Sequence, residues 1–342
     1  ARAVSARGTG VLRVTLVVVV GLVVFSGAYL YRLLTPSADI DDYSVYLRDD
    51  LGEAGGGQVA ITFFGVSTLL FDDGETQLLV DAFFSRPSKI DLLTTMRSDE
   101  ATVETVLSDY GIDRLEALFV AHSHFDHALD VAEVARRTPA TVYGTPSTVN
   151  IGLGGGADPS RLVAVGSGDS IHVGAFTVRV VESPHSPPPV GEPQSEPETI
   201  DRPLEQPASN ADFAEGGNFS FIISRGDRTF VVVASANYRP GFLAGTDADV
   251  LLLGTARLGV ADEVFQDRYV AETVELTSPE TVVPLHWDDF TLPWRRGAAR
   301  FNPRLVDPEP TGGFERVIAG AERMGAEFVL LQAGSKLLIG PG

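Results

Sequence analysis

The most informative ten residues of this chain read Ala121-His122-Ser123-His124-Phe125-Asp126-His127-Ala128-Leu129-Asp130. They hold three of the protein's six histidines, together with an aspartate between them. The side chains of His122 and His124 leave an extended backbone on the same side, so both imidazoles can bind one metal ion. Asp126 and His127 then face a second position. Zinc accepts this mixture of imidazole nitrogen and carboxylate oxygen. The motif therefore predicts a metal centre.

The residues around this motif predict a strand that leads into a helix. Residues 115–121 form a short apolar run typical of a buried strand, which would deliver His122 at its C-terminal end. Residues 131–137 have the pattern of a helix. Ligands at such a junction lie on the rim of a sheet, where a rigid backbone holds them and a substrate has access.

Two further histidines also follow predicted strands. Residues 171–181 alternate between apolar and polar side chains and predict one strand, after which comes His185. Residues 281–285 predict another strand, which delivers His286. We interpret both histidines as metal ligands. His172 has no partner at ligand spacing, and we interpret it as an ordinary surface histidine.

The rest of the pattern predicts the alternating strands and helices of one α/β domain. Strands are predicted over residues 59–64, 68–71, 77–80, 141–143, 161–165, 218–223, 229–234, 250–253 and 328–331, and helices over 98–110, 261–275 and 314–324. Asp81 follows one of these strands, and we expect it either to hydrogen-bond a ligand histidine or to cap a turn.

Three loops complete the expected domain. The glycines of residues 152–156 lack the Gly-x-Gly-x-x-Gly spacing of a nucleotide cradle, so we interpret them as a structural loop. The acidic, proline-rich residues 187–215 begin two residues after His185, and we expect a flap over the site. A second Pro/Gly-rich loop is expected over residues 303–313.

The composition excludes several classes of function. A formal charge of −20 and a pI near 4.6 disfavour nucleic acid as a partner, because phosphate contacts need clustered Lys and Arg. The absence of cysteine excludes disulfides, thiolate ligands and cysteine nucleophiles. No Gly-x-Ser-x-Gly elbow occurs, so Ser-His-Asp catalysis of that type is disfavoured.

The N-terminal residues predict a membrane-inserting segment. Residues 14–31 contain no charge and are mostly Val and Leu, and as a helix they would span about 27 Å, enough for the hydrocarbon core of a bilayer. Three arginines precede this run and three aspartates follow it, at Arg2, Arg7, Arg13, Asp39, Asp41 and Asp42, which predicts a cytoplasmic N-terminus and an extracytoplasmic main domain.

Cleavage of a signal peptide at Ser26-Gly27-Ala28, followed by secretion, is the alternative to an anchor. We favour the anchor because the apolar run continues past that site. The expected organisation is a signal anchor or transmembrane helix over residues 1–34, a linker over 35–57 and a domain over 58–342.

These motifs together resemble the metallo-β-lactamase superfamily. The resemblance covers residues 59–339 and is carried by Phe64-Gly65, Leu79-Val80-Asp81, His122-Ser123-His124-Phe125-Asp126-His127, His185 and Pro284-Leu285-His286-Trp287-Asp288-Asp289-Phe290. The branch that the chain most resembles contains ascorbate-6-phosphate lactonase-like enzymes and N-acylphosphatidylethanolamine phospholipase D. This resemblance implies an α/β fold, a four-layered αβ/βα sandwich, with metals at one edge between two sheets.

The resemblance also implies how the ligands are shared. His122, His124 and His185 would hold the first metal, and Asp126, His127 and His286 the second. We expect one or two Zn²⁺ ions, with Mn²⁺ or Fe²⁺ as alternatives. The family normally adds an aspartate that bridges both metals, after the strand that here ends at Ala234, but this chain has Ser235-Ala236-Asn237. Asn237 would be a weaker, uncharged ligand. Asp288, like Asp81, is a candidate for a weak ligand or for a hydrogen-bond partner of the ligands.

The function implied is hydrolysis by a metal-bound hydroxide, with Asp126 as the catalytic residue that orients the hydroxide or takes its proton. The substrate would be a small-molecule ester, lactone, amide or phosphodiester. The membrane helix and the flap favour a lipid-like substrate.

Two alternatives to this function stay open. One is a non-catalytic or mononuclear metal-binding envelope domain, which the missing bridging acid favours. The other is an iron-dependent redox enzyme of the same fold, although di-iron members usually place a glutamate where this chain has His124.

Overall fold

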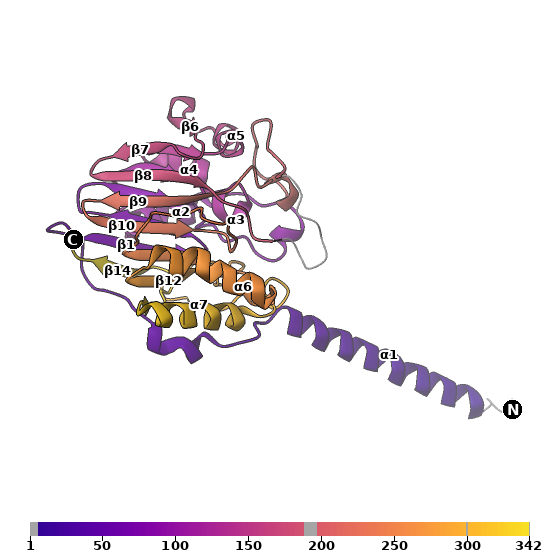
Figure 1. Cartoon of the computed structure of the whole chain (residues 1–342). Coiled ribbons are helices and arrows are strands. Elements are labelled where there is room, and N and C mark those ends of the chain that lie inside the picture. Colours follow the sequence, from indigo (N-terminus) through magenta and orange to yellow (C-terminus); the bar gives the residue numbers. More distant parts are fainter. Residues whose placement is uncertain (1–5, 188–196, 299, 342) are drawn as a thin grey trace.

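Two mixed β-sheets of seven strands each form the centre of the domain (Figure 1). The structure is a computed structural model, and it describes residues 6–187, 197–298 and 300–341. The strand order is β14-β1-β2-β3-β4-β5-β6 in the first sheet and β13-β12-β11-β10-β9-β8-β7 in the second. Helices lie on the outer face of each sheet, which is consistent with the expected αβ/βα sandwich.

The first sheet contains two antiparallel hairpin pairings followed by parallel strands. Its strands are β1 (Val59–Gly65), β2 (Thr68–Asp72), β3 (Gln77–Val80), β4 (Leu115–Phe119), β5 (Thr141–Gly144), β6 (Leu162–Ala164) and β14 (Ser335–Ile339). From β3 to β6 neighbouring strands are parallel. Because parallel neighbours need crossover connections, helices α2 (Glu100–Asp109), α4 (Val131–Arg137) and α5 (Pro146–Gly154) join or follow them.

The second sheet has the same mixed character. Its strands are β7 (Ser170–Val173), β8 (Phe176–Glu182), β9 (Phe219–Arg225), β10 (Arg228–Val233), β11 (Val250–Gly254), β12 (Thr281–Leu285) and β13 (Glu327–Phe328). Strands β10 to β13 are parallel, and helices α6 (Glu263–Val270), its π-helical extension (Ala271–Glu275) and α7 (Pro310–Met324) connect them. Figure 1 shows α6 and α7 lying together beside this sheet.

The main core lies between the two sheets. Phe71 packs against Phe230 and Phe119 against Phe221, with ring centroids 5.6 Å and 5.7 Å apart, so aromatic side chains join the two inner faces. Burial of each such ring stabilises the fold by about 1.5–3 kcal/mol. The central strands of the second sheet are buried along their whole length, as expected of parallel strands with both faces covered.

The apolar N-terminal segment forms one long helix, α1 (Ala6–Leu33). Its residues 15–33 have a mean hydropathy of 2.0 and project away from the domain (Figure 1), so by length and composition this helix is a weak candidate for a membrane span. A signal sequence would give the same pattern. The foot of α1 is held to the domain, because the backbone N–H of Leu305 donates to the carbonyl of Leu33 over 3.0 Å.

The segment expected to be a linker packs in part against the domain. Within residues 35–57, the 3₁₀-helix η1 (Ile40–Tyr46) buries Ile40 and Tyr43. The ring of Tyr43 meets that of Phe314 edge to face, with centroids 5.2 Å apart. Sequence reasoning weighed the acids and glycines of this segment and overlooked two apolar side chains three residues apart, which face the same side of a short helix.

The structure differs from two of the predicted elements, each of which contains glycine. Residues 152–154 lie in helix α5 and not in the predicted loop. They are required by packing, since a Cβ on Gly152 would lie 2.7 Å from the Leu162 side chain and one on Gly154 would lie 2.0 Å from the Leu204 carbonyl oxygen. The single strand predicted over 171–181 is instead the hairpin of β7 and β8, which turns at Gly174 with a φ of +54°.

The C-terminal prediction was incomplete. Helix α7 begins at Pro310, inside the predicted Pro/Gly-rich loop, with that proline in its first turn. The strand predicted over 328–331 is the short β13, and the chain then continues into β14, which sequence reasoning missed. Strand β14 pairs with β1 from the far end of the sequence, so no local pattern marks it as an edge partner.

The acidic, proline-rich segment is described only in part. Residues 188–196 of the expected flap lie outside the described residues. After them, the backbone N–H of Ile200 donates to Ser147 Oγ and that of Leu204 to the Asn150 carbonyl, at 2.9 Å and 3.0 Å. Residues 200–204 therefore lie against helix α5, whereas Ala208 pairs with Met96 and the Glu215 carbonyl accepts from the Ser123 N–H at 2.9 Å.

Candidate metal centre

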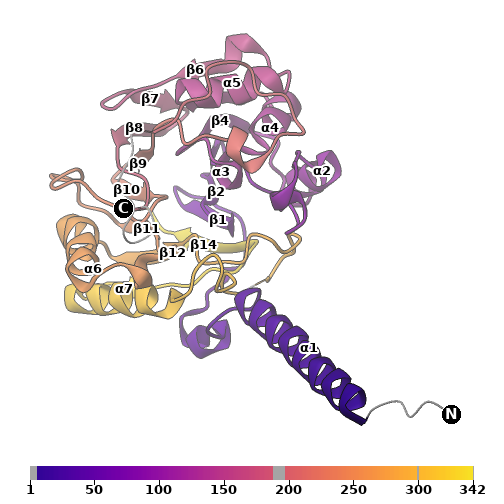
Figure 2. The same cartoon turned by 90° about the vertical axis from the view of Figure 1, so that its right-hand side faces the viewer.

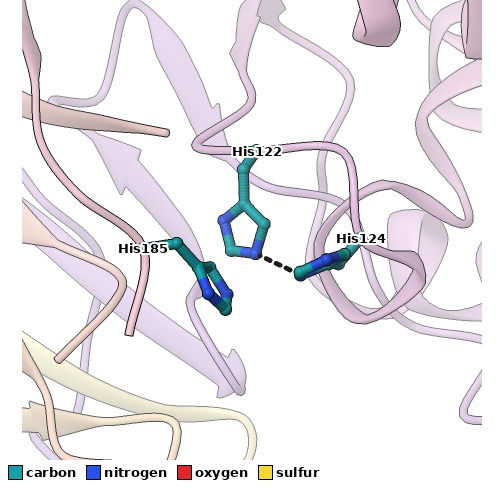
Figure 3. A group of neighbouring side chains, drawn as sticks. All are labelled: His122, His124 and His185. Carbon is teal, nitrogen blue, oxygen red and sulfur yellow. Dashed lines mark hydrogen bonds between the residues drawn. The ribbon is translucent and has the colours of Figure 1, made fainter. Parts of the chain in front are cut away.

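Three histidines from the ends of two strands converge at one edge of the sandwich. His122 and His124 follow β4, and His185 follows β8. The Nε2 atom of His122 lies 3.1 Å from Nδ1 of His124, and the ring of His185 lies 4.7 Å and 4.8 Å from theirs, centroid to centroid. Figure 3 shows the three rings gathered from two sides. We call these residues the first triad; one ligand atom from each lies within 4.8 Å of the others.

A second group adjoins the first. Asp126 and His127 lie in the short helix α3 (Phe125–Ala128), and His286 follows β12. Asp126 Oδ2 lies 3.1 Å from His286 Nε2 and 3.9 Å from His127 Nε2. We call these three residues the second triad. The ring of His127 is only 3.8 Å from that of His122, so the two triads share one site.

The sequence pattern and the structure agree on where these residues lie. All six candidate ligands are brought together, and each follows a strand or lies on the short helix after β4. His172 is exposed on β7, where its Nδ1 lies 3.0 Å from Thr177 Oγ1, away from both triads. The convergence of six such side chains from three strand ends makes this edge a candidate metal centre.

Asp81 holds a histidine of the second triad. Its Oδ2 accepts hydrogen bonds from His127 Nδ1 and Ser67 Oγ, at 2.8 Å and 2.5 Å, and its Oδ1 accepts one from the Ala121 backbone N–H at 2.7 Å. This leaves His127 Nε2 facing Asp126. A carboxylate behind an imidazole fixes both the ring and its tautomer, which is the usual arrangement at metal sites. Ser67 was missed by sequence reasoning, since nothing local marks a serine that completes such a network.

Asp288 supports the site through the backbone. Its Oδ1 accepts from the Val66 N–H at 2.7 Å, and its Oδ2 lies 3.0 Å from Arg86 Nη2. The Val66 carbonyl in turn accepts from the His286 N–H at 2.7 Å. His286 has a φ of +62°, in the left-handed region that is strained for a non-glycine residue, so contacts from outside the loop are needed to hold it. Arg86 is a further residue that sequence reasoning missed, because its partner lies about 200 residues away.

Asn237 occupies the position at which the family normally has an aspartate that bridges both metals. Its side-chain amide instead forms hydrogen bonds with the backbone. Its Nδ2 donates to the His185 carbonyl over 2.6 Å, and its Oδ1 accepts from the Tyr238 N–H at 2.8 Å. Next to it, the Ala236 N–H donates to Ser186 Oγ at 3.0 Å. These contacts hold the backbone of the loop that carries His185.

The variant Asn237→Ala is therefore expected to weaken metal binding at the first triad. Loss of a contact that orients a ligand typically lowers metal affinity about 10–100-fold. Competition with a chromophoric chelator measures this affinity. Asn210→Ala, at an exposed asparagine of the 3₁₀-helix η4 (Asn210–Asp212), is the matched control and should leave it unchanged. An affinity in Asn237→Ala equal to that of the control would show that the amide does not position His185.

The electrostatics of the site favour metal-binding protonation states. Burial holds the pKa of His122 well below its ordinary value, and burial together with the neighbouring His124 lowers the pKa of His185 to about 3. Burial alone would raise the pKa of Asp126, but His127 and His286 outweigh it and lower that pKa. Metal ligands must be deprotonated imidazoles and ionised carboxylates, so these pKa directions at the first triad and at Asp126 favour binding of a divalent cation. The first triad offers three imidazole nitrogens and the second two nitrogens with one carboxylate oxygen, and zinc accepts both donor sets.

These shifts predict a weak pH dependence of metal affinity at the first triad. Its three histidines have lowered pKa values, those of His122 and His185 strongly, so protons compete with metal less than they do at ordinary histidines. Three ordinary histidines would lose about 50-fold in affinity between pH 7.5 and 6.0, whereas we expect a loss of less than about threefold.

The second triad should behave differently. Burial would lower the pKa of His127, but Asp81 outweighs burial and raises it, so proton competition there begins at higher pH. Chelator competition at pH 7.5 and 6.0 separates the two cases. A large loss at the tighter site between these pH values would contradict the assignment of that site to the first triad.

Comparison with known proteins places this geometry in a family. Residues 61–247, more than half of the chain, match the family model of the metallo-beta-lactamase superfamily. A UPF0173 metal-dependent hydrolase of Staphylococcus aureus strain MRSA252 is 35% identical over 85 residues, which are 25% of this chain and 30% of that protein. The match thus spans less than a third of the curated relative.

Solved structures share the fold at low sequence identity. Igni18, a metallo hydrolase from the archaeon Ignicoccus hospitalis, superposes with a TM-score of 0.52 at 16% identity, covering 83% of this chain and all of that one. The metallo-beta-lactamase fold protein YhfI from Bacillus subtilis gives a TM-score of 0.51 at 15% identity, with 82% and 100% covered. These likenesses show the fold, and the family model, which matches more than half of the chain, shows that the chain belongs to the metallo-beta-lactamase superfamily.

Proposed function

We propose that this chain is a metal-dependent hydrolase whose first and second triads each hold one Zn²⁺ ion. The observation that carries the proposal is the convergence of two complete ligand sets, with one ligand atom from each member within 4.8 Å of the others in its triad. The curated relatives are named metal-dependent hydrolases, which supports the same chemistry. We further propose that residues 58–342 form the catalytic domain.

The residues of the site have distinct parts in this proposal. Bound metal ions would lower the pKa of a coordinated water and polarise the bond to be cleaved. Asp126 is ionised, and with its Oδ2 3.1 Å from His286 Nε2 it is held at the boundary of the triads, where it can orient a water and accept its proton. Asp81 keeps His127 in place, and the Asp288 contact to Val66 supports the loop of His286.

The proposed substrate is a small, amphiphilic ester, lactone or phosphodiester, with a lipid-like molecule as the first choice. The support is the apolar helix α1, which would keep the domain at a membrane on the extracytoplasmic side. We propose that α1 is retained as an anchor, since its apolar stretch continues past Ala28 and its foot is bound to Leu305. The net charge of −20 disfavours a nucleic-acid substrate.

A mononuclear or non-catalytic metal-binding domain is the second candidate. It is favoured by one observation, the commitment of the Asn237 amide to the His185 carbonyl, which leaves the two triads without a shared carboxylate from that position. Binding of Mn²⁺ or Fe²⁺ is the corresponding alternative in metal identity. A redox role with iron is less well supported, because the first triad offers only histidine nitrogen.

The test is metal-dependent hydrolysis by the full chain. The protein, purified in detergent, is stripped of metal, reloaded with Zn²⁺, Mn²⁺ or Fe²⁺ and assayed on nitrophenyl esters, lactones and bis(nitrophenyl) phosphate. We expect one metal to restore hydrolysis of at least one class, and His122→Ala to abolish it. A protein that takes up two equivalents of metal and hydrolyses none of these classes would contradict the proposal and favour the binding domain.

A further inference from the structure

A basic segment lies beside the foot of α1. Residues 294–304 contain four arginines and no acid, although the whole chain carries a formal charge of −20. Arg296 is paired with Asp49 at 3.0 Å, and Arg304 contacts the Thr35 carbonyl. Arg295 and Arg300 are exposed, and within the described part of the chain their side chains form no ion pair or hydrogen bond. Two exposed arginines, which border a small cavity shared with Asp288 and Asp289, therefore face the solvent at this place.

The backbone joins this segment directly to the apolar helix. The N–H of Arg304 donates to the Thr35 carbonyl and the N–H of Leu305 to the Leu33 carbonyl, both over 3.0 Å. Leu305 itself is 62% exposed. An exposed leucine thus lies where α1 leaves the domain, at the depth at which a bilayer spanned by α1 would begin.

Exposed apolar side chains on a second loop adjoin the same segment. Ile90 and Leu93, next to and within the 3₁₀-helix η2 (Asp91–Leu93), are 72% and 86% exposed. Asp91 of this loop and Trp294 line one cavity of about 910 Å³, so the two loops border each other. Single exposed apolar side chains are ordinary, but Ile90 and Leu93 on one turn beside exposed arginines form an amphipathic surface.

The arrangement of the elements places this surface on the metal-site side of the domain. Figure 1 shows α1 leaving the domain on the side where α3 lies, and α3 carries Asp126 and His127. In Figure 2, which looks onto that side, α3 and the foot of α1 both face the viewer. A membrane spanned by α1 would therefore face the edge of the domain that holds the two triads.

We propose that Ile90, Leu93, Trp294, Arg295, Arg300 and Leu305 form a membrane-contact surface that rests on the anionic headgroups of the bilayer spanned by α1. The inference rests on the anchoring role of α1 in the proposed function. Arginine is attracted to anionic lipid within about a Debye length, roughly 10 Å, and its stem and the leucine side chains can enter the headgroup layer. The backbone contacts of Arg304 and Leu305 with Thr35 and Leu33 keep the segment that carries these arginines beside the foot of α1. The cavity beside Trp294 then opens at the headgroups, where an amphiphilic substrate would reside.

The fluorescence of Trp294 can report whether this surface contacts the membrane. It is half-buried, whereas the only other tryptophan, Trp287, is 1% exposed in the core and serves as an internal reference. The full chain is reconstituted into vesicles of zwitterionic lipid with or without anionic lipid, each carrying a nitroxide near the headgroup. We expect the nitroxide to quench Trp294 fluorescence, more strongly with anionic lipid, and Trp294→Phe to remove the quenched component.

Charge reversal tests the role of the arginines. Arg295→Glu combined with Arg300→Glu should lower the quenching by about half or more, because attraction becomes repulsion. Arg268→Glu combined with Arg323→Glu, at exposed arginines of α6 and α7, makes the same change in net charge and should have no effect.

The outcomes separate this inference from the proposed function. Vesicle flotation reports whether α1 holds the chain in the membrane, and hydrolysis is assayed separately. A chain that does not float with vesicles refutes the anchor and this surface with it. A chain that floats while Trp294 is not quenched, or is quenched equally in the charge-reversed variant, refutes the surface and leaves the anchor and the hydrolase intact.

Discussion

The variant His124→Ala is expected to bind one metal ion fewer per chain than the unchanged protein. His124 supplies one of only three nitrogen ligands in the first triad, and its Nδ1 lies 3.1 Å from His122 Nε2. Two histidines hold zinc far more weakly than three, so we expect the affinity to fall by about a thousandfold or more. Metal content after gel filtration, with chelator competition for the affinity, measures this change.

The chain offers a matched control for this substitution. His172 is exposed on β7 and contacts Thr177, so His172→Ala makes the same chemical change outside the site. It should leave metal content and affinity unchanged. Far-ultraviolet circular dichroism of both variants checks that the fold persists. Metal content in His124→Ala equal to that of His172→Ala would show that the first triad is not the binding site.

The positions of the six candidate ligands were predictable because each is marked by a local signal. His122 and His286 directly follow buried apolar strands, and His185 follows the alternating strand β8. Such strands are recognised by their side-chain period, and each of the three, β4, β8 and β12, delivers its histidine beyond its C-terminal end. The other three ligands, His124, Asp126 and His127, were predicted from their spacing after His122 in one motif.

The rest of the site depends on contacts between distant residues, which no local pattern records. Arg86 meets Asp288 across about 200 residues, and the Asn237 amide binds the carbonyl of His185. In the same way, β14 pairs with β1 from the other end of the domain. The glycines of α5 misled the prediction for a related reason. Residue 154 must be glycine because the backbone of Leu204 lies too close for a Cβ atom, and this contact exists only in the folded chain.

The two triads are adjacent but are supported by different parts of the fold. The first is held at His185 by Asn237, and the second at His127 by Asp81. Asp81 also accepts a hydrogen bond from the Ala121 N–H, next to His122, whereas the hydrogen bonds of the Asn237 side chain are made to the backbone at His185 and Tyr238. Because the position of a bridging acid is taken by an engaged amide, the triads should fill and empty more independently than if they shared a charged ligand. A substitution in the second triad can therefore test catalysis while the first keeps its metal.

Asp126→Asn is the substitution that makes this test. Asparagine keeps the size of the side chain but removes the charge that lies 3.1 Å from His286 Nε2. We expect metal binding at the second triad to weaken. We also expect the rate of hydrolysis to fall about 10²–10⁴-fold, the usual loss when a positioned acid–base group is removed. Metal content and initial rates are measured on the same preparations, with Asp227→Asn at an exposed turn as the control.

The pair of measurements distinguishes the two candidate functions. Two metal equivalents that fall toward one in Asp126→Asn, together with the loss of rate, fit a dinuclear hydrolase whose second triad works without a bridging acid. One equivalent in both the unchanged protein and the variant, at the same rate, contradicts a role for Asp126 in metal binding and in proton transfer. The first triad would then be the whole centre, and the engaged amide of Asn237 would be the structural reason that a second ion is not held.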